Sequence, residues 1–423
     1  MNQHSASRLQ KNNFISKNLD IFFFIFLFAI ISDNKNVQVT LSSIAASGGI
    51  LLLIRNWHLY FNEVKANRYL YIALGFSIPI GIAMIDTLLP EKRFSVFNTS
   101  LLYIFIGVLP IYVLEKGNNF KRLETLVVLG VLFIALDAVS QWLTGYHTLG
   151  YNPPLKDRVY GIFGEWAHIS YFLATFSPAV FFYLYQKLSI KLSVINIIGA
   201  IIALLLLVVG IMLGGARAGF VSLLVSLFLF TAYLFYSGKI KHRLRFVLIS
   251  LTLLIGFIVI ASFIPEVQER YLRTTAAFGT DDFLNRFTTK RTNIWHVAFS
   301  EVPNYFINGV GTRGFNNLYQ TYPDSYKLFV HIYHPHLHGL EVLIETGLIG
   351  FIPYIIICFY LLIKIFKAKA GNMWLIIGFV ALMPINSHVA IYEHYWQPII
   401  WIPIMIGLAL AYRADKVQTT SHG

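Results

Sequence analysis

The chain has 423 residues, of which 57% are hydrophobic and only 13% are charged. A soluble domain is typically about 45–50% apolar and about 25% charged, so the composition argues against a soluble protein. The formal net charge is +13. Because the Lys and Arg residues gather in short segments between apolar blocks, we interpret this excess as an orientation signal in a membrane protein. It does not indicate a nucleic-acid partner.

Apolar blocks of helical length follow one another along the chain, and a helix needs about 20 apolar residues to cross a bilayer. The alternating pattern that is typical of a transmembrane β-barrel is missing from the sequence. We therefore expect an all-α polytopic membrane protein with about 12 transmembrane helices. The expected spans lie near 18–32, 37–54, 69–89, 96–114, 123–143, 166–186, 190–213, 218–236, 246–264, 347–363, 372–390 and 396–412.

The distribution of Lys and Arg predicts both termini in the cytoplasm, because most of them then fall in short cytoplasmic segments. The chain divides into transmembrane helices 1–9 over 1–264, a periplasmic loop with short helices over 265–346, and transmembrane helices 10–12 with a cytoplasmic tail over 347–423. Aromatic residues recur through the long loop, so we expect it to fold. One loop helix should run from about Thr289 to Ser300.

Arg217 stands between two apolar blocks in the segment MLGGARAGFVSLL. An arginine at depth in a membrane costs at least a few kcal/mol and is usually paired or functional. We expect Arg217 to bind an anion, which its small neighbours would allow to approach the backbone. The alternative is a tight outer turn from which Arg217 extends to the lipid headgroups.

Arg291 follows Lys290 at the start of the expected loop helix, for which Thr288 or Thr289 is the candidate cap. Basic residues in a first turn oppose the helix dipole. This conflict predicts an external anion at the helix start. The alternative is a solvated surface arginine.

Four histidines lie in eight positions, HIYHPHLH, at 331–338. Pro335 can occupy the first turn of a helix, and the helix would then place Glu341 and Glu345 on one face. We expect one ring to accept a proton or to contact the reacting group near neutral pH. Interfacial polar residues without a chemical role are the alternative. A metal site built from these rings and Glu341 is disfavoured because no H-E-x-x-H pattern is present.

A further polar segment, NSHVAIYEHYWQP, covers 386–398. His388, Glu393 and His394 would extend a polar site on the same side of the membrane. We favour an aromatic interfacial belt built from Tyr392, Tyr395 and Trp396 over this polar role.

The segment 200–355 resembles the O-antigen ligase family, within the wider Wzy_C group. The family pattern has a histidine, then Asn, Ser or Gln, and a glycine eleven residues after the histidine. His336 and Gly347 have this spacing, and LIG follows. Leu337 stands where the polar residue is usual, so His338 remains the alternative reactive ring.

Two arginines extend the resemblance. Arg217 in GGARAGF looks like the arginine of the family's T-R-A or S-R-[AG] segment, and Arg291 in KRTNIW looks like its second arginine. The family then implies that both hold the donor pyrophosphate and that His336 assists the acceptor hydroxyl. His334, Arg313 and Glu341 are accessory candidates, Arg313 within the glycine-rich GVGTRGF, which we interpret as a loop.

The resemblance implies a GT-C-like membrane glycosyltransferase of lipopolysaccharide biosynthesis that needs no metal or cofactor. It would transfer O-polysaccharide from undecaprenyl pyrophosphate to lipid A-core, with inversion, at the periplasmic face of a bacterial inner membrane. An O-antigen polymerase or a protein O-oligosaccharyltransferase would use the same kind of donor and a different acceptor.

Two rivals belong to other classes. A transporter or flippase would need several charges within its spans, and Asp86 and Asp137 are the main candidates. This scarcity disfavours transport. A non-catalytic scaffold for assembly of the cell envelope is the other rival.

Overall fold

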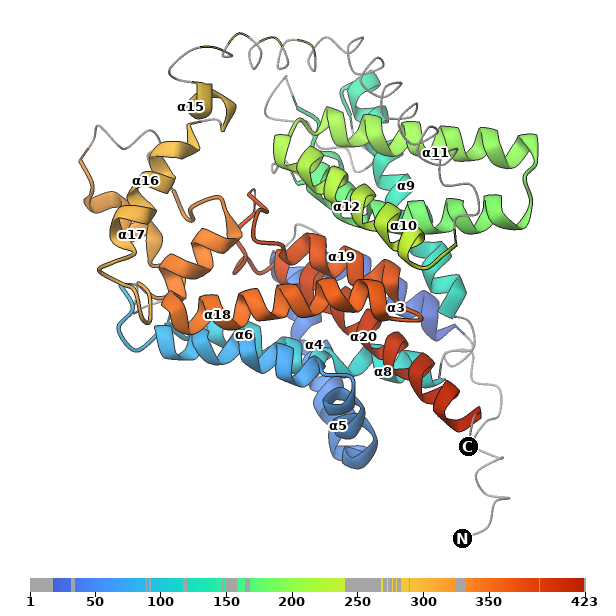
Figure 1. The fold of residues 1–423 in the computed structure, drawn as a ribbon, viewed down its shortest axis with the longest axis horizontal. Helices are drawn as coiled ribbons and strands as arrows, with labels where there is room; N and C mark the ends of the chain where they lie inside the picture. The colour runs from blue at the N-terminus through green and yellow to red at the C-terminus, as the bar shows by residue number, and fades with distance from the viewer. Residues whose placement is uncertain are drawn as a thin grey trace.

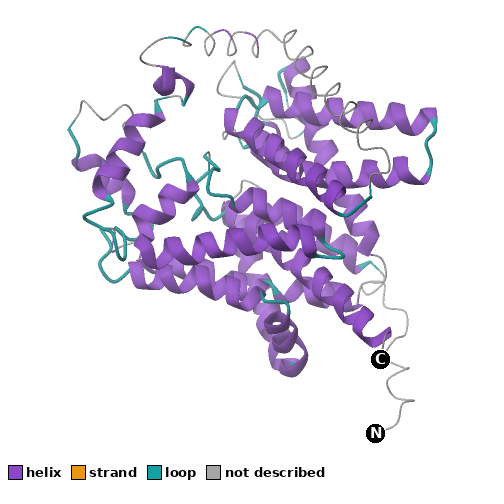
Figure 2. Cartoon of the chain, viewed as in Figure 1, coloured by secondary structure: helices purple, strands orange, loops and turns teal. Residues whose placement is uncertain are grey.

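The structure is a computed structural model (Figure 1). It describes residues 18–31, 35–88, 90, 93–116, 120–146, 148, 158–163, 168–239, 268, 272, 276, 279, 283–288, 290–323, 332–387 and 389–421. Within these ranges the regular structure is helical, with no strand (Figure 2).

The N-terminal helices are α3 (Leu19–Ile31), α4 (Lys35–Arg55), α5 (Trp57–Ala66), α6 (Tyr69–Ala83), α7 (Arg93–Ile106), α8 (Val108–Lys116) and α9 (Phe120–Thr144). They are followed by the short 3-10 turn η2 (Gly161–Phe163) and by α10 (Ile169–Ile190), α11 (Val194–Leu213) and α12 (Arg217–Tyr236). The remaining described helices are α15 (Phe283–Phe287), α16 (Arg291–Glu301), α17 (Phe315–Thr321), α18 (His338–Lys367), α19 (Asn372–Leu382) and α20 (Trp396–Ser421).

Seven helices of the described residues are long and apolar enough to cross a membrane. Each expected span overlaps a described helix except 246–264, which lies outside the described residues. The number of spans that cross a membrane stays a prediction. Helix α5 was not expected, and the expected span 96–114 is divided into α7 and α8. The division falls at Gly107, where a Cβ atom would collide with the ring of Tyr69.

Two helix boundaries differ from the sequence prediction. Helix α19 ends at Leu382, although the sequence predicted a span to 390, and an irregular segment leads from there to α20. Helix α18 begins at His338, nine residues before the predicted span, and is interrupted at Gly347, whose φ of 58° and ψ of −161° are not helical. Only glycine adopts this region readily.

The break in α18 is filled by the backbone of the long loop. The N–H groups of Leu348 and Ile349 donate to the carbonyls of Phe306 and Ile307. On the other side of the break, the N–H groups of Val310 and Gly311 donate to carbonyls of α18 at Ile344 and Glu345. The loop thus provides hydrogen-bond partners for backbone groups that an interrupted helix would otherwise leave without them.

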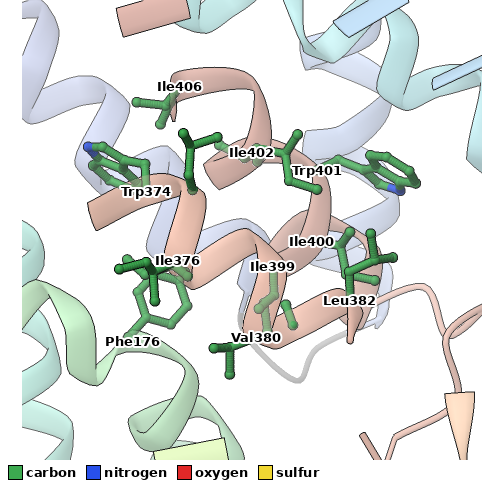
Figure 3. Packing of buried hydrophobic residues seen from close by; sticks show 14 of the residues in the cluster. Phe176, Trp374, Ile376, Val380, Leu382, Ile399, Ile400, Trp401, Ile402 and Ile406 are labelled. Carbon is green, nitrogen blue, oxygen red and sulfur yellow. The ribbon is translucent and has the colours of Figure 1, made fainter. Parts of the chain in front are cut away.

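The main core lies where α10, α19 and α20 pack together (Figure 3). Trp374 and Ile376 of α19 and Ile400 of α20 are almost fully buried in this core. Figure 1 shows α9, α10, α11 and α12 as one group of helices, and α18 lying along α6 in a second group.

A second, smaller core belongs to the long loop. Ile294 and Val297 of α16 and Phe315 of α17 pack there against Ile344 of α18, and all four are at most 1% exposed. The expected helix from Thr289 to Ser300 is thereby found as α16, and it is fixed against the first turns of α18.

Candidate functional site

Arg291 is the first residue of α16, and Lys290 before it has a left-handed φ of 64°. The predicted threonine cap is wrong. No side chain caps α16, and Thr288 Oγ1 instead donates to the carbonyl of Leu284 in the preceding turn. Among the described residues, no side-chain cap thus satisfies the first N–H groups of α16. The helix also begins with a guanidinium group, and this arrangement favours an anion.

Arg217 is likewise the first residue of its helix, α12, and no side chain caps that helix either. The turn between α11 and α12 is tight, and Arg217 is exposed at its end. Gly219 is required there, because a Cβ atom would lie 2.8 Å from Cβ of Ser170. Ser170 Oγ donates to the carbonyl of Ile211 at 2.7 Å and accepts from the Ala216 N–H at 3.3 Å.

The two arginines lie close enough for their charges to interact. Burial lowers the pKa of Arg291 to about 10, and the positive charge of Arg217 acts in the same direction. Arg291 Nη1 donates to Ser387 Oγ at 3.0 Å, in the segment between α19 and α20. Two guanidinium groups brought together at uncapped helix starts form a positive region on which a doubly charged anion can bind.

The histidine segment is not helical where the sequence predicted a helix from Pro335. His336 has a left-handed φ of 54°, and Leu337 is extended with a φ of −160°. The helix therefore cannot begin before His338. As a result the rings of His334 and His336 approach each other, with centroids 4.0 Å apart. Both residues are half-buried.

His338 has a different environment from the two preceding histidines. It is fully buried, and its Nε2 lies 2.8 Å from the carbonyl oxygen of Val389. Its backbone N–H donates to the carbonyl of Asn386 at 2.9 Å. His338 thus joins the start of α18 to the segment that carries Ser387, the partner of Arg291.

Helix α16 is also tied directly to the histidine segment. Trp295, one helical turn after Arg291, donates its indole N–H to the carbonyl of Pro335 at 2.9 Å. Since residues four apart lie on one helix face, Arg291 and Trp295 lie on the same face of α16. The structure therefore brings α16, which begins at Arg291, against the segment that holds His334 and His336, and Arg217 lies close enough for its charge to act on Arg291.

Arg313 and Glu393 form an ion pair at 2.6 Å beside this region. The other oxygen of this carboxylate, Oε1, accepts a hydrogen bond from His394 Nδ1–H at 2.6 Å. Burial opposes ionisation of Glu393, but the hydrogen bond from His394 and the charge of Arg313 lower its pKa to about 2. Since Glu393 neutralises it, Arg313 contributes less positive charge to an external anion than Arg291.

Glu341 and Glu345 lie on one face of α18, as predicted, and both are fully buried. Glu345 Oε2 accepts from the backbone N–H of Arg313 at 2.7 Å, and Glu341 Oε2 accepts from the N–H of Ile391 at 3.1 Å. These carboxylates hold neighbouring backbone segments together. Among the described residues, no three His, Cys, Asp or Glu side chains converge as metal ligands.

The aromatic segment before α20 is not an interfacial belt. Tyr392 and Trp396 are buried, and the indole N–H of Trp396 donates to the carbonyl of Ala381. Tyr395 Oη lies 3.1 Å from His168 Nδ1 at the start of α10. His388 lies outside the described residues. These aromatic residues therefore connect helices within the protein.

Sequence reasoning missed three side chains that organise the site. Ser387 binds Arg291, Ser170 supports the turn before Arg217, and His168 contacts Tyr395. The partners are separated by 96, 41 and 227 residues respectively, and no local pattern signals such contacts. Trp295 stands in the arginine motif KRTNIW, but the motif does not indicate its contact with Pro335.

The helices define an all-helical protein with several segments able to cross a membrane and a cluster of arginine and histidine residues at one end of them. Residues 201–355 match the model of the Wzy_C family, described as O-antigen ligase. The match confirms the resemblance of this segment to the O-antigen ligase family. No curated protein matches the chain.

Proposed function

We propose that the protein is an O-antigen ligase, which transfers O-polysaccharide from undecaprenyl pyrophosphate to lipid A-core. The observation that carries this proposal is the convergence of Arg217 and Arg291 near the His334–His338 segment, within the stretch that matches the family. We also propose a GT-C-like arrangement of about 12 spans. Both termini would lie in the cytoplasm and the site would face the periplasm.

The two arginines would bind the donor pyrophosphate. Guanidinium groups pair with phosphate oxygens in bidentate fashion, and the uncapped starts of α12 and α16 add N–H donors. Negative charge on the pyrophosphate grows as it leaves the sugar. Fixed cations therefore stabilise the transition state more than the bound substrate, which is the condition for catalysis.

His336 would act on the acceptor. Its half-buried ring lies in the non-helical segment beside α16, whereas the His338 ring is buried against Val389. In the proposed step the acceptor hydroxyl oxygen attacks the anomeric carbon from the face opposite the pyrophosphate. The carbon–oxygen bond to pyrophosphate breaks, His336 takes the hydroxyl proton, and undecaprenyl pyrophosphate leaves. The anomeric centre is inverted.

Reconstitution tests the proposal and separates it from its close rivals. The purified protein is placed in liposomes together with polymer-linked undecaprenyl pyrophosphate. In three separate reactions, lipid A-core, a single-repeat donor or an acceptor peptide is then added. We expect polymer on lipid A-core, equally with and without a chelator. Elongation of single repeats would indicate a polymerase, and a glycosylated peptide would indicate a protein O-oligosaccharyltransferase. Loss of activity with chelator, restored by zinc or manganese, would refute the metal-independent scheme.

A further inference from the structure

A polar cavity lies at the end of the helices remote from the histidine segment. It has a volume of about 280 Å³ and lies between the α5–α6 junction, α18 and α20. Its lining includes Arg68, Lys364, Tyr360, Asn67 and Asp415. Lys364 is 26 residues after His338 in α18, so roughly 40 Å of helix separates this cavity from the candidate site.

Two cations line the cavity without a carboxylate partner of their own. Neither Arg68 nor Lys364 forms an ion pair with any residue that the structure describes, whereas Arg413 nearby is paired with Glu63 at 2.7 Å. The Lys364 ammonium lies 6.0 Å from the centre of the Tyr360 ring. Asp415 is about half-exposed and lies 3.7 Å from Lys369 instead. The cavity therefore carries an excess of positive charge.

Two buried donors without hydrogen-bond partners also belong to this lining. Asn67 is 4% exposed; its Oδ1 accepts from the Tyr69 N–H at 3.0 Å, but its Nδ2 has no hydrogen-bond partner. The hydroxyl of Tyr360 is likewise buried without one. Buried polar atoms are nearly always hydrogen-bonded. Two orphaned donors beside two cations thus indicate a ligand with several acceptor oxygens.

We propose that this cavity binds the phosphate group of an anionic membrane lipid. A phosphate offers acceptors to all four groups, and its charge matches the excess of Arg68 and Lys364. Phe359 and Ile363, on the same stretch of α18, are 61% and 52% exposed, as expected for side chains that contact acyl chains. The sequence-based orientation places this end at the cytoplasmic leaflet, which is rich in anionic lipids.

The bound lipid would contact α6, α18 and α20 at one end. The opposite ends of these three helices lie near the candidate site. Helix α6 leads to Leu88, whose N–H donates to the carbonyl of Val310, α18 begins at His338, and α20 begins at Trp396. The inference does not depend on the reaction proposed above. It concerns separate residues and is tested by binding alone.

The test is a titration of the purified full-length protein with phosphatidylglycerol, followed by native mass spectrometry. We expect Arg68→Gln and Lys364→Gln each to weaken binding about tenfold, since each removes a charge-assisted contact. Tyr360→Phe, which keeps the ring, should weaken it about threefold. Lys367→Gln is the matched control. It removes an exposed lysine one turn further along α18 and should leave the affinity unchanged.

Two results would overturn the proposal. If Lys364→Gln and Lys367→Gln weakened phosphatidylglycerol binding equally, the lipid would be attracted by the positive charge of the protein surface and not bound in a specific site. Binding of inorganic phosphate with no binding of phosphatidylglycerol would mean a site for a soluble anion. Phosphatidylcholine with the same chains serves as the neutral comparison and should bind at least about tenfold more weakly, because it lacks net charge.

Discussion

Trp295 donates its indole N–H to the carbonyl of Pro335 at 2.9 Å and so joins α16 to the histidine segment, 40 residues further along the chain. Arg291 lies one turn before Trp295 on the same helix. This hydrogen bond thus helps to fix the position of a candidate phosphate ligand relative to His336. A change at Trp295 should therefore affect the reaction more than the stability of the fold.

Trp295→Phe tests this positioning role. A neutral hydrogen bond contributes about 1 kcal/mol to stability, so the thermal midpoint should fall only slightly. The transfer rate should fall about tenfold or more, because small displacements of reacting groups are costly. Trp57→Phe, at an exposed tryptophan of α5, is the control. Equal effects on the rate from both variants would contradict the positioning role.

The two candidate histidines can be separated by their environments. His336→Ala should abolish transfer while leaving the thermal midpoint nearly unchanged, because the ring is half-buried. His338→Ala should lower stability by about 1–3 kcal/mol, because it removes a buried contact with the Val389 carbonyl. Transfer per folded molecule should persist in that variant. The reverse pattern in a transfer assay would assign the reactive ring to His338.

Glu393 should make stability depend on acid pH. Because its pKa in the folded protein is lowered to about 2, ionised Glu393 stabilises the fold above the ordinary pKa of a glutamate. That contribution is lost as the pH falls through about 4 towards 2, and it amounts to at most about 3 kcal/mol. Between pH 7 and pH 3, the thermal midpoint of Glu393→Gln should fall less steeply than that of the wild-type protein. Parallel curves for both proteins would contradict this account.

The glycine at the break of α18 should not tolerate a side chain. At Gly347 a Cβ atom would collide with the carbonyl oxygen of Ile307, and its φ of 58° is unfavourable for other residues. Gly347→Ala should therefore reduce the yield of folded protein and its thermal midpoint. Gly199→Ala in α11 is the matched control. Its Cβ atom meets open space, and the change should stabilise the helix by about 0.5–1 kcal/mol.

Much of the helical framework could be predicted from the sequence, because apolar blocks of membrane-spanning length carry a strong signal. The start of α16 was also predictable to within two residues of Thr289. The start of α18 was not, because proline is compatible with a helical first turn and nothing local reveals the left-handed φ of His336. The extent of α19 was overestimated, since the apolar residues after Leu382 are buried in an irregular segment.

The site was predictable only in part. Arg217, Arg291 and His336 stand in motifs, so their residue types and spacing point to them. The ion pair of Arg313 with Glu393 joins residues 80 apart, and the contact of Arg291 with Ser387 joins residues 96 apart. Such pairs depend on how the long loop folds over α18, and this packing leaves no periodic pattern in the sequence.

Binding of the donor, measured separately from transfer, tests the central claim most directly. Undecaprenyl pyrophosphate-linked glycan is titrated into purified wild-type protein and into the Arg217→Ala, Arg291→Ala and His336→Ala variants, with Lys290→Asn as a control at an exposed neighbour. The arginine variants should bind the donor at least about tenfold more weakly, because each loses a charge-assisted contact. His336→Ala should bind normally and transfer nothing. Normal donor binding by both arginine variants, or normal transfer by His336→Ala, would contradict the account.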